Sequence, residues 1–190
     1  MEAKLAEKEA WEGVKSLLGN YSLQWGSHWS YNFRNDPKRL AFVLSRYKFA
    51  AKMSRKNKKI LEMGCSEGVG ATILGENAVS YVGVDLDLSA IDSAKKSFFS
   101  ESKYTFMYDD FLGKFYGLFD TIVSLDVIEH IYKEHEDLFF KTILKNLSPQ
   151  GIVVLGTPNI CSEQYASEAS KLGHVNLYSQ ERLFSKMKEY

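Results

Sequence analysis

Residues 60–74 read I-L-E-M-G-C-S-E-G-V-G-A-T-I-L, and residues 80–87 read S-Y-V-G-V-D-L-D. The first stretch is a short apolar run that enters a glycine-rich loop and then a helical turn. The second is another apolar run, and it ends on Asp85. A strand, a glycine loop, a helix and a second strand that ends in an acid are typical of a nucleotide-binding βαβ unit. Such glycines let the backbone approach a ligand closely, and the terminal acid can accept both hydroxyls of a ribose.

The details of the loop distinguish between classes of nucleotide. Ser66 stands where the dinucleotide fingerprint G-x-G-x-x-G needs its second glycine. Glu62 and Glu67 would repel a pyrophosphate and suit a ligand that carries positive charge beside a ribose. S-adenosylmethionine, which has an ammonium, a sulfonium and no phosphate, fits this description. The alternative is a purely structural βα turn in which Asp85 caps the following helix.

Outward from this unit, strand-like and helix-like patterns alternate along the chain. Further strands are expected at residues 104–108, 119–125 and 152–155, and a turn at 148–151. Helices are expected at residues 2–18, 37–53, 88–99, 137–147 and 179–190. The alternation predicts an α/β fold with a mostly parallel sheet flanked by helices.

Composition narrows the class of protein. The 190 residues include 24 Lys and Arg and 24 Asp and Glu, so the formal net charge is zero. The protein therefore has no overall electrostatic field that attracts nucleic acid, which counts against nucleic acid as a partner. The basic run Arg55–Lys59 is either a solvated connector or an RNA contact. No apolar run approaches the ~20 residues that span a bilayer, no signal-peptide core precedes the first helix, and Cys65 and Cys161 lie in loops. A cytoplasmic location without a membrane partner is expected.

Four segments together resemble the class I S-adenosylmethionine-dependent methyltransferases, which have a Rossmann-like fold. These segments are the opening βαβ unit, the acidic pair and phenylalanine at 109–111, the fourth-strand region 119–131 and the fifth-strand region 147–159. The resemblance implies S-adenosyl-L-methionine as cofactor. It also implies that the following residues bind it: Glu62, Gly64, Cys65, Gly68, Asp85, Leu86, Asp109, Asp110, Phe111 and Leu125.

The resemblance also bears on the ends of the fold. The family's core usually has seven strands. Because only five strands are predicted along this chain, the C-terminal strands six and seven are expected to be missing here. An uncovered edge on strand five would invite association, so we expect either low stability of the chain alone or a homodimer that covers that edge. We divide the chain into residues 1–59, with N-terminal helices and a lid or substrate segment, and residues 60–190, the cofactor-binding core.

A D-x-x-E-H segment follows the fourth strand. An oxygen or nitrogen acceptor must lose a proton to a base or a metal, and we expect Glu129, His130 and His174 to be the catalytic residues. With Asp126 they could also bind a divalent ion such as Mg²⁺. In this feature the chain is similar to small-molecule O- and N-methyltransferases. The alternatives are His130 or His174 as a metal-free base or hydrogen-bond donor, or purely structural roles.

Aromatic residues crowd into the polar segment Asn20–Asn35, outside any clear periodic element. Loops carry binding groups more often than their share, so we expect this segment to fold over the cofactor as a lid. Packing of its rings against the sheet's helices is the alternative. The expected substrate-binding residues are Trp25, His28, Trp29, Tyr31, Asp126 and Asn159.

These observations predict a methyltransferase that acts on an oxygen or nitrogen of a small polar metabolite or sugar-like acceptor. Two other functions stay open. One is a non-catalytic partner subunit that binds S-adenosylmethionine, and the other is a methyltransferase of RNA or another nucleic acid.

Overall fold

A single parallel sheet organises the fold. The computed structural model describes residues 2–19, 23–54, 58–98 and 101–190. Its five strands are β1 (Lys58–Met63), β2 (Ala78–Asp85), β3 (Tyr104–Tyr108), β4 (Phe119–Leu125) and β5 (Leu147–Gly156). They lie in the order β3-β2-β1-β4-β5, and every pairing is parallel. The strand order reverses between β1 and β4, and in such sheets ligands bind beyond the carboxyl ends of the strands at this switch point.

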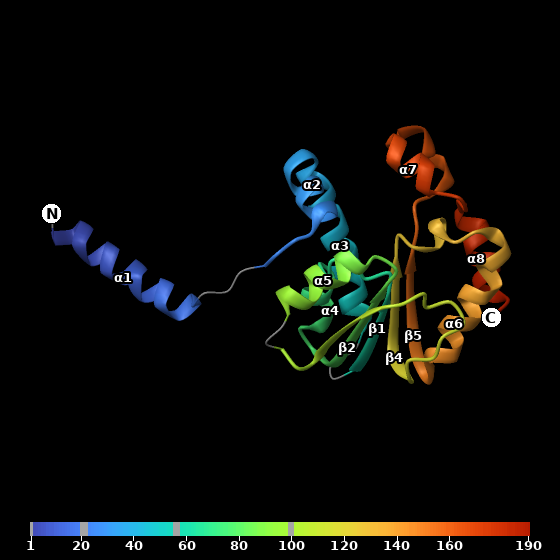
Figure 1. Ribbon diagram of the computed structural model, residues 1–190, viewed down its shortest axis with the longest axis horizontal. Coiled ribbons are helices and arrows are strands. Elements are labelled where there is room, and N and C mark those ends of the chain that lie inside the picture. The colour runs from blue at the N-terminus through green and yellow to red at the C-terminus, as the bar shows by residue number, and fades with distance from the viewer. Residues whose placement is uncertain (1, 20–22, 55–57, 99–100) are drawn as a thin grey trace.

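Helices cover both faces of the sheet, as Figure 1 shows. On one face lie α3 (Pro37–Met53), α4 (Ala71–Gly75) and α5 (Leu88–Ser97); on the other lie α6 (Glu136–Asn146) and α8 (Gln180–Lys188). A hydrophobic core lies on each face of the sheet, and alternate residues of β1 contribute to the two cores. Ile60 belongs to the core under α3, and Leu61 belongs to the core under α6. The predicted α/β fold, a parallel sheet between helices, is confirmed.

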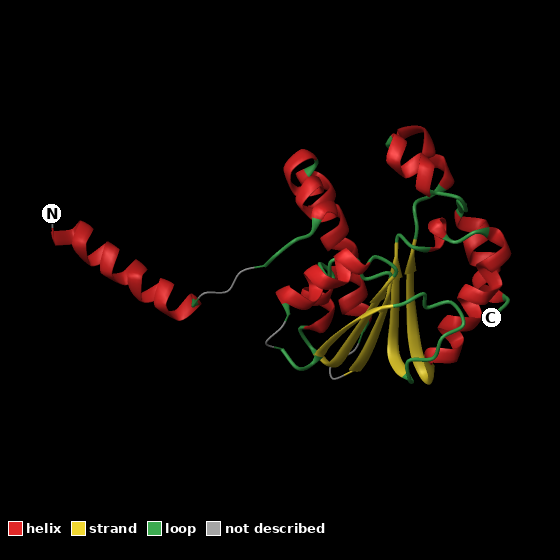
Figure 2. Ribbon diagram, viewed as in Figure 1, coloured by secondary structure: helices red, strands yellow, loops and turns green. Residues whose placement is uncertain are grey.

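Two short helices rise beyond the strand ends rather than packing on the sheet. They are α2 (Ser27–Asn35) and α7 (Glu168–Gly173), and Figure 2 shows them on either side of the carboxyl end of the sheet. Short 3₁₀ segments at Ile128–His130, Lys133–His135 and Ile160–Tyr165 connect other elements. The predicted first helix is present as α1 (Glu2–Leu18), and its side chains from residue 6 onward are exposed.

Several predicted boundaries are corrected. The turn expected at residues 148–151 is wrong, because these residues lie within β5, where the register to β4 shifts between Phe119 and Thr121. The polar, turn-like residues therefore form an irregularity inside a strand. The second part of the expected lid, residues 27–35, is helical. Residues 20–22 of that segment and 55–57 of the basic run lie outside the described residues.

The basic run continues directly into β1. Lys58 forms an ion pair with Asp120 at 3.6 Å, and the Lys59 backbone N–H donates to the same carboxylate at 3.0 Å. Strand β5 is an edge of the sheet, and its pairing with a second copy stays a prediction. Within the described part of the chain, no helix is long and apolar enough to cross a membrane.

Candidate functional site

The glycine loop after β1 is closely packed against the segment after β4. Gly64 has a φ of +81°, a left-handed conformation that glycine adopts without strain. A Cβ atom there would lie 2.2 Å from Cγ2 of Val127. The Gly64 N–H donates to the carbonyl of Val84 at 2.8 Å, so the loop is held to the end of β2. A side chain at position 64 would force the two segments apart.

Asp85 at the end of β2 is held by backbone groups on both sides. Its Oδ2 accepts from the Ser66 N–H at 2.7 Å, and its Oδ1 accepts from the Asp87 N–H at 2.9 Å. Ser66 itself has a left-handed φ of 47°. The alternative in which Asp85 caps the next helix is wrong, since Asp87 accepts from the first N–H groups of α5.

Glu62 lies beneath the loop and is fully buried. The Tyr47 hydroxyl donates to its Oε1 at 2.7 Å, and the Tyr81 hydroxyl donates to its Oε2. Burial raises the pKa of Glu62 to about 7. The neighbouring Cys65 is also buried, and burial raises the pKa of its thiol. The structure therefore places both predicted cofactor residues behind the wall of the site.

Glu67, the other acid of the loop, binds the N-terminus of α2. Its oxygens accept from the N–H groups of His28 at 2.9 Å and Trp29 at 3.2 Å. A Cβ atom at Gly26 would lie 2.5 Å from Oε1 of Glu67, so glycine permits this close approach. Free N–H groups at a helix start favour a negative partner. That Glu67 favours a cationic ligand stays a prediction; the structure shows that its carboxylate binds the start of α2.

A cavity of about 320 Å³ opens at the switch point, between the β1 and β2 ends on one side and the β4 end on the other. Its lining contains several predicted residues: His28, Trp29, Gly64, Asp85, Leu86, Phe111, Leu125, Asp126, Glu129, His130 and His174. It also contains residues that sequence reasoning missed: Arg39, Val43, Arg46, Tyr47, Ser66, Val127, Ile131 and Pro158.

A signal for part of the missed wall was present in the sequence. Arg39, Val43, Arg46 and Tyr47 recur at the spacing of one helix face, and that face of α3 lines the cavity. Two arginines seven residues apart on an otherwise apolar helix face predict a polar cavity beside it.

Three predicted catalytic residues converge at one end of the cavity. Ligand atoms of Glu129, His130 and His174 all lie within 4.8 Å of one another. The two imidazole rings are 5.1 Å apart, and Nδ1 of His130 lies 2.8 Å from the carbonyl of Gly173. With Nδ1 donating to that carbonyl, Nε2 of His130 is left as the acceptor atom.

Glu129 is fully buried, and one of its two carboxylate oxygens has a hydrogen-bond partner among the described residues. Its Oε2 accepts from the Thr157 hydroxyl at 2.9 Å, and its Oε1 has no hydrogen-bond partner within the described residues. Burial raises the pKa of this carboxyl group to about 7. A buried polar atom without a partner is costly, and a carboxyl group poised near neutrality is typical of functional sites.

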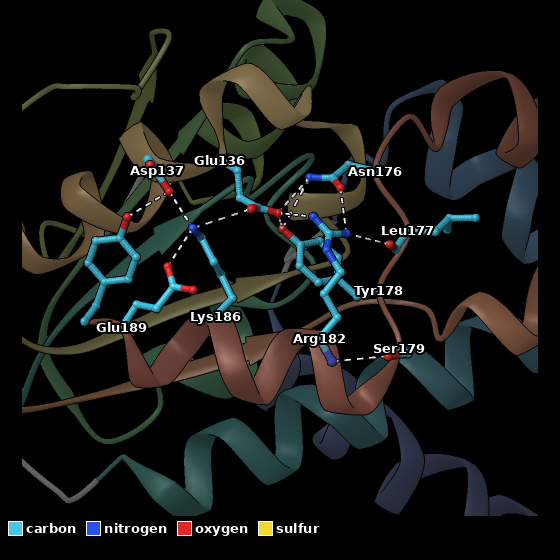
Figure 3. Close-up of polar contacts among 10 residues, drawn as sticks. Glu136, Asp137, Asn176, Leu177, Tyr178, Ser179, Arg182, Lys186 and Glu189 are labelled. Atoms are coloured by element: carbon cyan, nitrogen blue, oxygen red, sulfur yellow. Dashed lines mark hydrogen bonds and ion pairs between the residues drawn. The ribbon is translucent and has the colours of Figure 1, made fainter.

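The chain around His174 is held in place from two directions. The N–H groups of Val175 and Asn176 donate to the carbonyl of Glu129 at 2.8 and 3.1 Å. Figure 3 shows the second attachment, where Glu136 at the start of α6 accepts from Asn176, Tyr178 and Arg182.

Arg182 at the start of α8 completes this attachment. Its Nη1 also donates to Oδ1 of Asn176 at 2.8 Å and to the carbonyl of Leu177 at 2.7 Å, and its guanidinium lies 4.0 Å from the centre of the Tyr178 ring. We name Glu136, Asn176, Tyr178 and Arg182 the C-terminal clamp. Sequence reasoning missed it, because Glu136 and Arg182 are 46 residues apart and share no local pattern.

Asp126 lines the same cavity, but its carboxylate is bound by an arginine of α3. Its φ of +56° is unusual for a residue other than glycine, and Arg46 of α3 binds both of its carboxylate oxygens. The predicted four-ligand metal set is therefore not assembled. Glu129, His130 and His174 converge, whereas the carboxylate of Asp126 is paired with a guanidinium.

Other predicted site residues lie away from the cavity lining. Trp25 packs edge-on against Phe33 at 5.2 Å and borders a second, apolar cavity that also contains Gly68. Tyr31 is 68% exposed. The Asn159 side chain caps the 3₁₀ segment that follows it by accepting from the Cys161 N–H.

The family resemblance implies that an acid of the 109–111 segment lies near the exocyclic amine of the adenine, but both acids are engaged elsewhere in the structure. Asp109 accepts from the Tyr116 hydroxyl at 3.0 Å and pairs with Lys114 at 3.6 Å. Asp110 accepts from the N–H of Leu112 at 3.1 Å. Of this triplet, only Phe111 lines the cavity.

Comparison with known proteins assigns the family. A family described as a methyltransferase domain matches residues 33–190, and the chain belongs to this family. Uncharacterized protein RP789 of Rickettsia prowazekii is 35% identical over 111 residues, which are 52% of this chain and 19% of that protein. Ubiquinone biosynthesis O-methyltransferase of Bartonella tribocorum is 28% identical over 140 residues, which are 65% of this chain and 53% of that protein. The chain thus spans about half the length of that relative.

Solved structures show the same fold. The N-methyltransferase NodS from Bradyrhizobium japonicum, in complex with S-adenosyl-L-homocysteine, has a TM-score of 0.68 to this chain at 19% identity. The likeness covers 87% of this chain and 81% of NodS. At this identity it establishes the Rossmann-like fold alone.

Proposed function

We propose that the chain binds S-adenosylmethionine and transfers its methyl group to an oxygen or nitrogen of a small acceptor. The observation that carries this proposal is the cavity at the switch point, which joins the Asp85 carboxylate to the buried Glu129 carboxyl group and two imidazoles. The methyltransferase family, the O-methyltransferase relative and the NodS complex with S-adenosyl-L-homocysteine support it.

The β1–β2 side of the cavity, which we name the cofactor half, suits a nucleoside. Asp85 is oriented by two N–H groups and retains lone pairs for the ribose hydroxyls. Gly64 keeps the loop close to the ligand space, while Phe111 and Leu125 give apolar surface for the adenine. The contact of Asp109 or Asp110 with the adenine amine stays a prediction, since both side chains are engaged in this structure.

The β4–β5 side, which we name the acceptor half, suits removal of a proton from the acceptor. When bound, the cofactor supplies a methyl group that its sulfonium has already activated. Placement of the nucleophile is then the main task, and the acceptor must give up a proton. Oε1 of Glu129, which has no hydrogen-bond partner among the described residues, can take it, because burial raises the pKa of this carboxyl group to about 7. His130 and His174 lie close enough to orient the acceptor or to take part in the transfer.

A divalent ion fits this half poorly. Glu129, His130 and His174 could supply three ligands, but the fourth predicted ligand is bound by Arg46. Proton removal by Glu129 or a histidine, without a metal, is therefore the favoured chemistry.

Two measurements test the proposal. Calorimetry should show binding of S-adenosylmethionine in clear preference to NAD, and labelled cofactor with a panel of small acceptors should yield S-adenosylhomocysteine. Activity should persist after exhaustive chelation with EDTA. Preferred binding of NAD contradicts the proposal as a whole, whereas loss of activity in EDTA with recovery on adding Mg²⁺ contradicts only its metal-free chemistry. Cofactor binding without turnover of any acceptor would favour a non-catalytic binding subunit.

A further inference from the structure

We propose that the acceptor carries an anionic group, a carboxylate or a phosphate, that binds the guanidinium of Arg39 in the acceptor half. This inference rests on the proposed function and adds the chemical class of the acceptor. Arg39 has no role in the proton removal proposed above, although it lines the same cavity as Glu129 and His174.

The two arginines that α3 contributes to the cavity differ in their partners. Arg46 holds the Asp126 carboxylate with both terminal nitrogens, so its charge is neutralised within the protein. For Arg39, no carboxylate of the described residues lies within 4.0 Å, and its backbone N–H alone is bound, to the carbonyl of Asp36. A guanidinium matches the two oxygens of a carboxylate or phosphate well. Arg39 therefore offers that geometry to a molecule in the cavity.

The remaining acids of the cavity do not compensate Arg39. Asp85 lies in the cofactor half and is bound by two backbone N–H groups. Asp126 is paired with Arg46, and Glu129 is buried with its carboxyl group held partly protonated near neutral pH. Among the described residues that line the acceptor half, Arg39 is thus the one guanidinium without an acidic partner, and the acids there are paired or partly protonated.

The charge of Arg39 influences the pKa values of two histidines that line the cavity. After burial, which has the larger effect, Arg39 lowers the pKa of His28 on α2 and contributes to the lowered pKa of His174. Arg39, His28 and His174 line the same cavity, and the guanidinium is within electrostatic reach of both imidazoles. An anionic group placed among them would gain from Arg39 and from N–H donors of the rings. A cationic acceptor would be repelled, and a neutral one would gain nothing from Arg39.

Calorimetry on the full chain saturated with S-adenosylhomocysteine tests this inference. Two pairs of hydroxyl compounds differ chiefly in the anionic group: 3,4-dihydroxybenzoate with catechol, and glycerol 3-phosphate with glycerol. At least one anionic compound should bind about tenfold or more tightly than its neutral partner, and the pair that shows this separates carboxylate from phosphate.

Arg39→Gln should remove that preference, and Arg39→Lys should restore part of it. Lys38→Gln is the matched control, because it removes a positive charge from the adjacent, exposed position that does not line the cavity. Equal binding within both pairs, failure of both anionic compounds to bind, or equal effects of Arg39→Gln and Lys38→Gln would overturn the inference. Failure of S-adenosylhomocysteine itself to bind would instead contradict the proposed function.

Discussion

The cofactor half and the acceptor half of the cavity are held together by different kinds of contact. In the cofactor half, backbone groups of a single βαβ unit bind one another or Asp85, as in the hydrogen bonds from Gly64 to Val84 and from Ser66 to Asp85. In the acceptor half, side chains from distant segments meet. Arg46 and Asp126, for example, are 80 residues apart in the sequence.

This difference has a consequence for robustness. A loop fixed by its own backbone depends on a few conformations, so only a change that alters them should disturb it. A site assembled from side chains of α3, β4, α6 and α8 depends on each long-range partner, so it can be adjusted or lost one residue at a time. The effects of substitutions in the two halves should therefore differ in kind as well as in size: loss of cofactor binding in the cofactor half, and graded changes of kcat in the acceptor half.

The largest expected effect concerns the cofactor half. Gly64→Ala should abolish measurable cofactor binding by calorimetry, because the new methyl group would lie 2.2 Å from Val127 in a left-handed conformation. Gly113→Ala is the matched control. Gly113 also has a left-handed φ, of +75°, but its nearest neighbour would be 3.7 Å from the new atom. Equal loss of cofactor affinity in both variants would show that general strain, rather than the closed loop, is responsible.

The next effect concerns the acceptor half. Glu129→Gln should lower kcat by about 100- to 10,000-fold, the usual contribution of a general base, and leave cofactor affinity nearly unchanged. Because the pKa of Glu129 is raised to about 7, the carboxylate form is lost as the pH falls through that value. Activity of the unmodified chain should therefore fall below about pH 7, and this decline should be absent from the residual activity of the variant.

A pH profile of kcat from pH 5 to 9 measures this fall in activity below about pH 7. If the profile of Glu129→Gln keeps the same acidic decline, another group takes the proton, and His174 becomes the first candidate. Unchanged kcat in the variant would remove Glu129 from the chemistry.

A smaller effect is expected from the C-terminal clamp. Arg182→Gln should lower kcat by about tenfold, since about 1.4 kcal/mol of misplacement has that effect on a rate, while the cofactor dissociation constant stays the same. The reason is positional: Arg182 binds Asn176 and Leu177, which lie two and three residues after His174. Arg182→Lys, which keeps the charge, should recover part of the rate.

Lys188→Gln gives the matched control for the clamp. Lys188 lies on the same helix as Arg182, and among the described residues it has no ion pair or hydrogen bond with a member of the clamp; its ammonium lies 4.2 Å from the centre of the Phe184 ring. If both variants lower the melting temperature alike and neither changes kcat, the clamp is structural only.

The sequence allowed prediction of the cofactor half because its information is local. An apolar run, glycines at fixed spacing and a terminal acid lie within 28 residues of chain, and each feature has a direct backbone consequence. Asp85 and Gly64 were placed correctly on this basis, as were the bounds of β3 and β4.

Features that depend on a distant partner could not be predicted in the same way. Glu67 reads as an acid beside a ligand, but its partner is the N-terminus of α2. Asp126 reads as a metal ligand until Arg46 is placed opposite it. The residues at 148–151 favour a turn locally, whereas in the structure they form an irregularity within β5 between Leu147 and Ile152, which pair with Phe119 and Thr121 of β4. In each case a tertiary contact overrides a sound local preference.

The bond between Glu67 and α2 sets a limit on protein engineering. The loop that shapes the cofactor half carries this carboxylate, and α2 brings His28 and Trp29 to the opposite wall of the cavity. A redesign of the loop to accept a different nucleoside would also release the helix that borders the acceptor. Cofactor range and acceptor range are therefore not independent design variables here, and libraries should vary Gly26, Glu67 and α2 together.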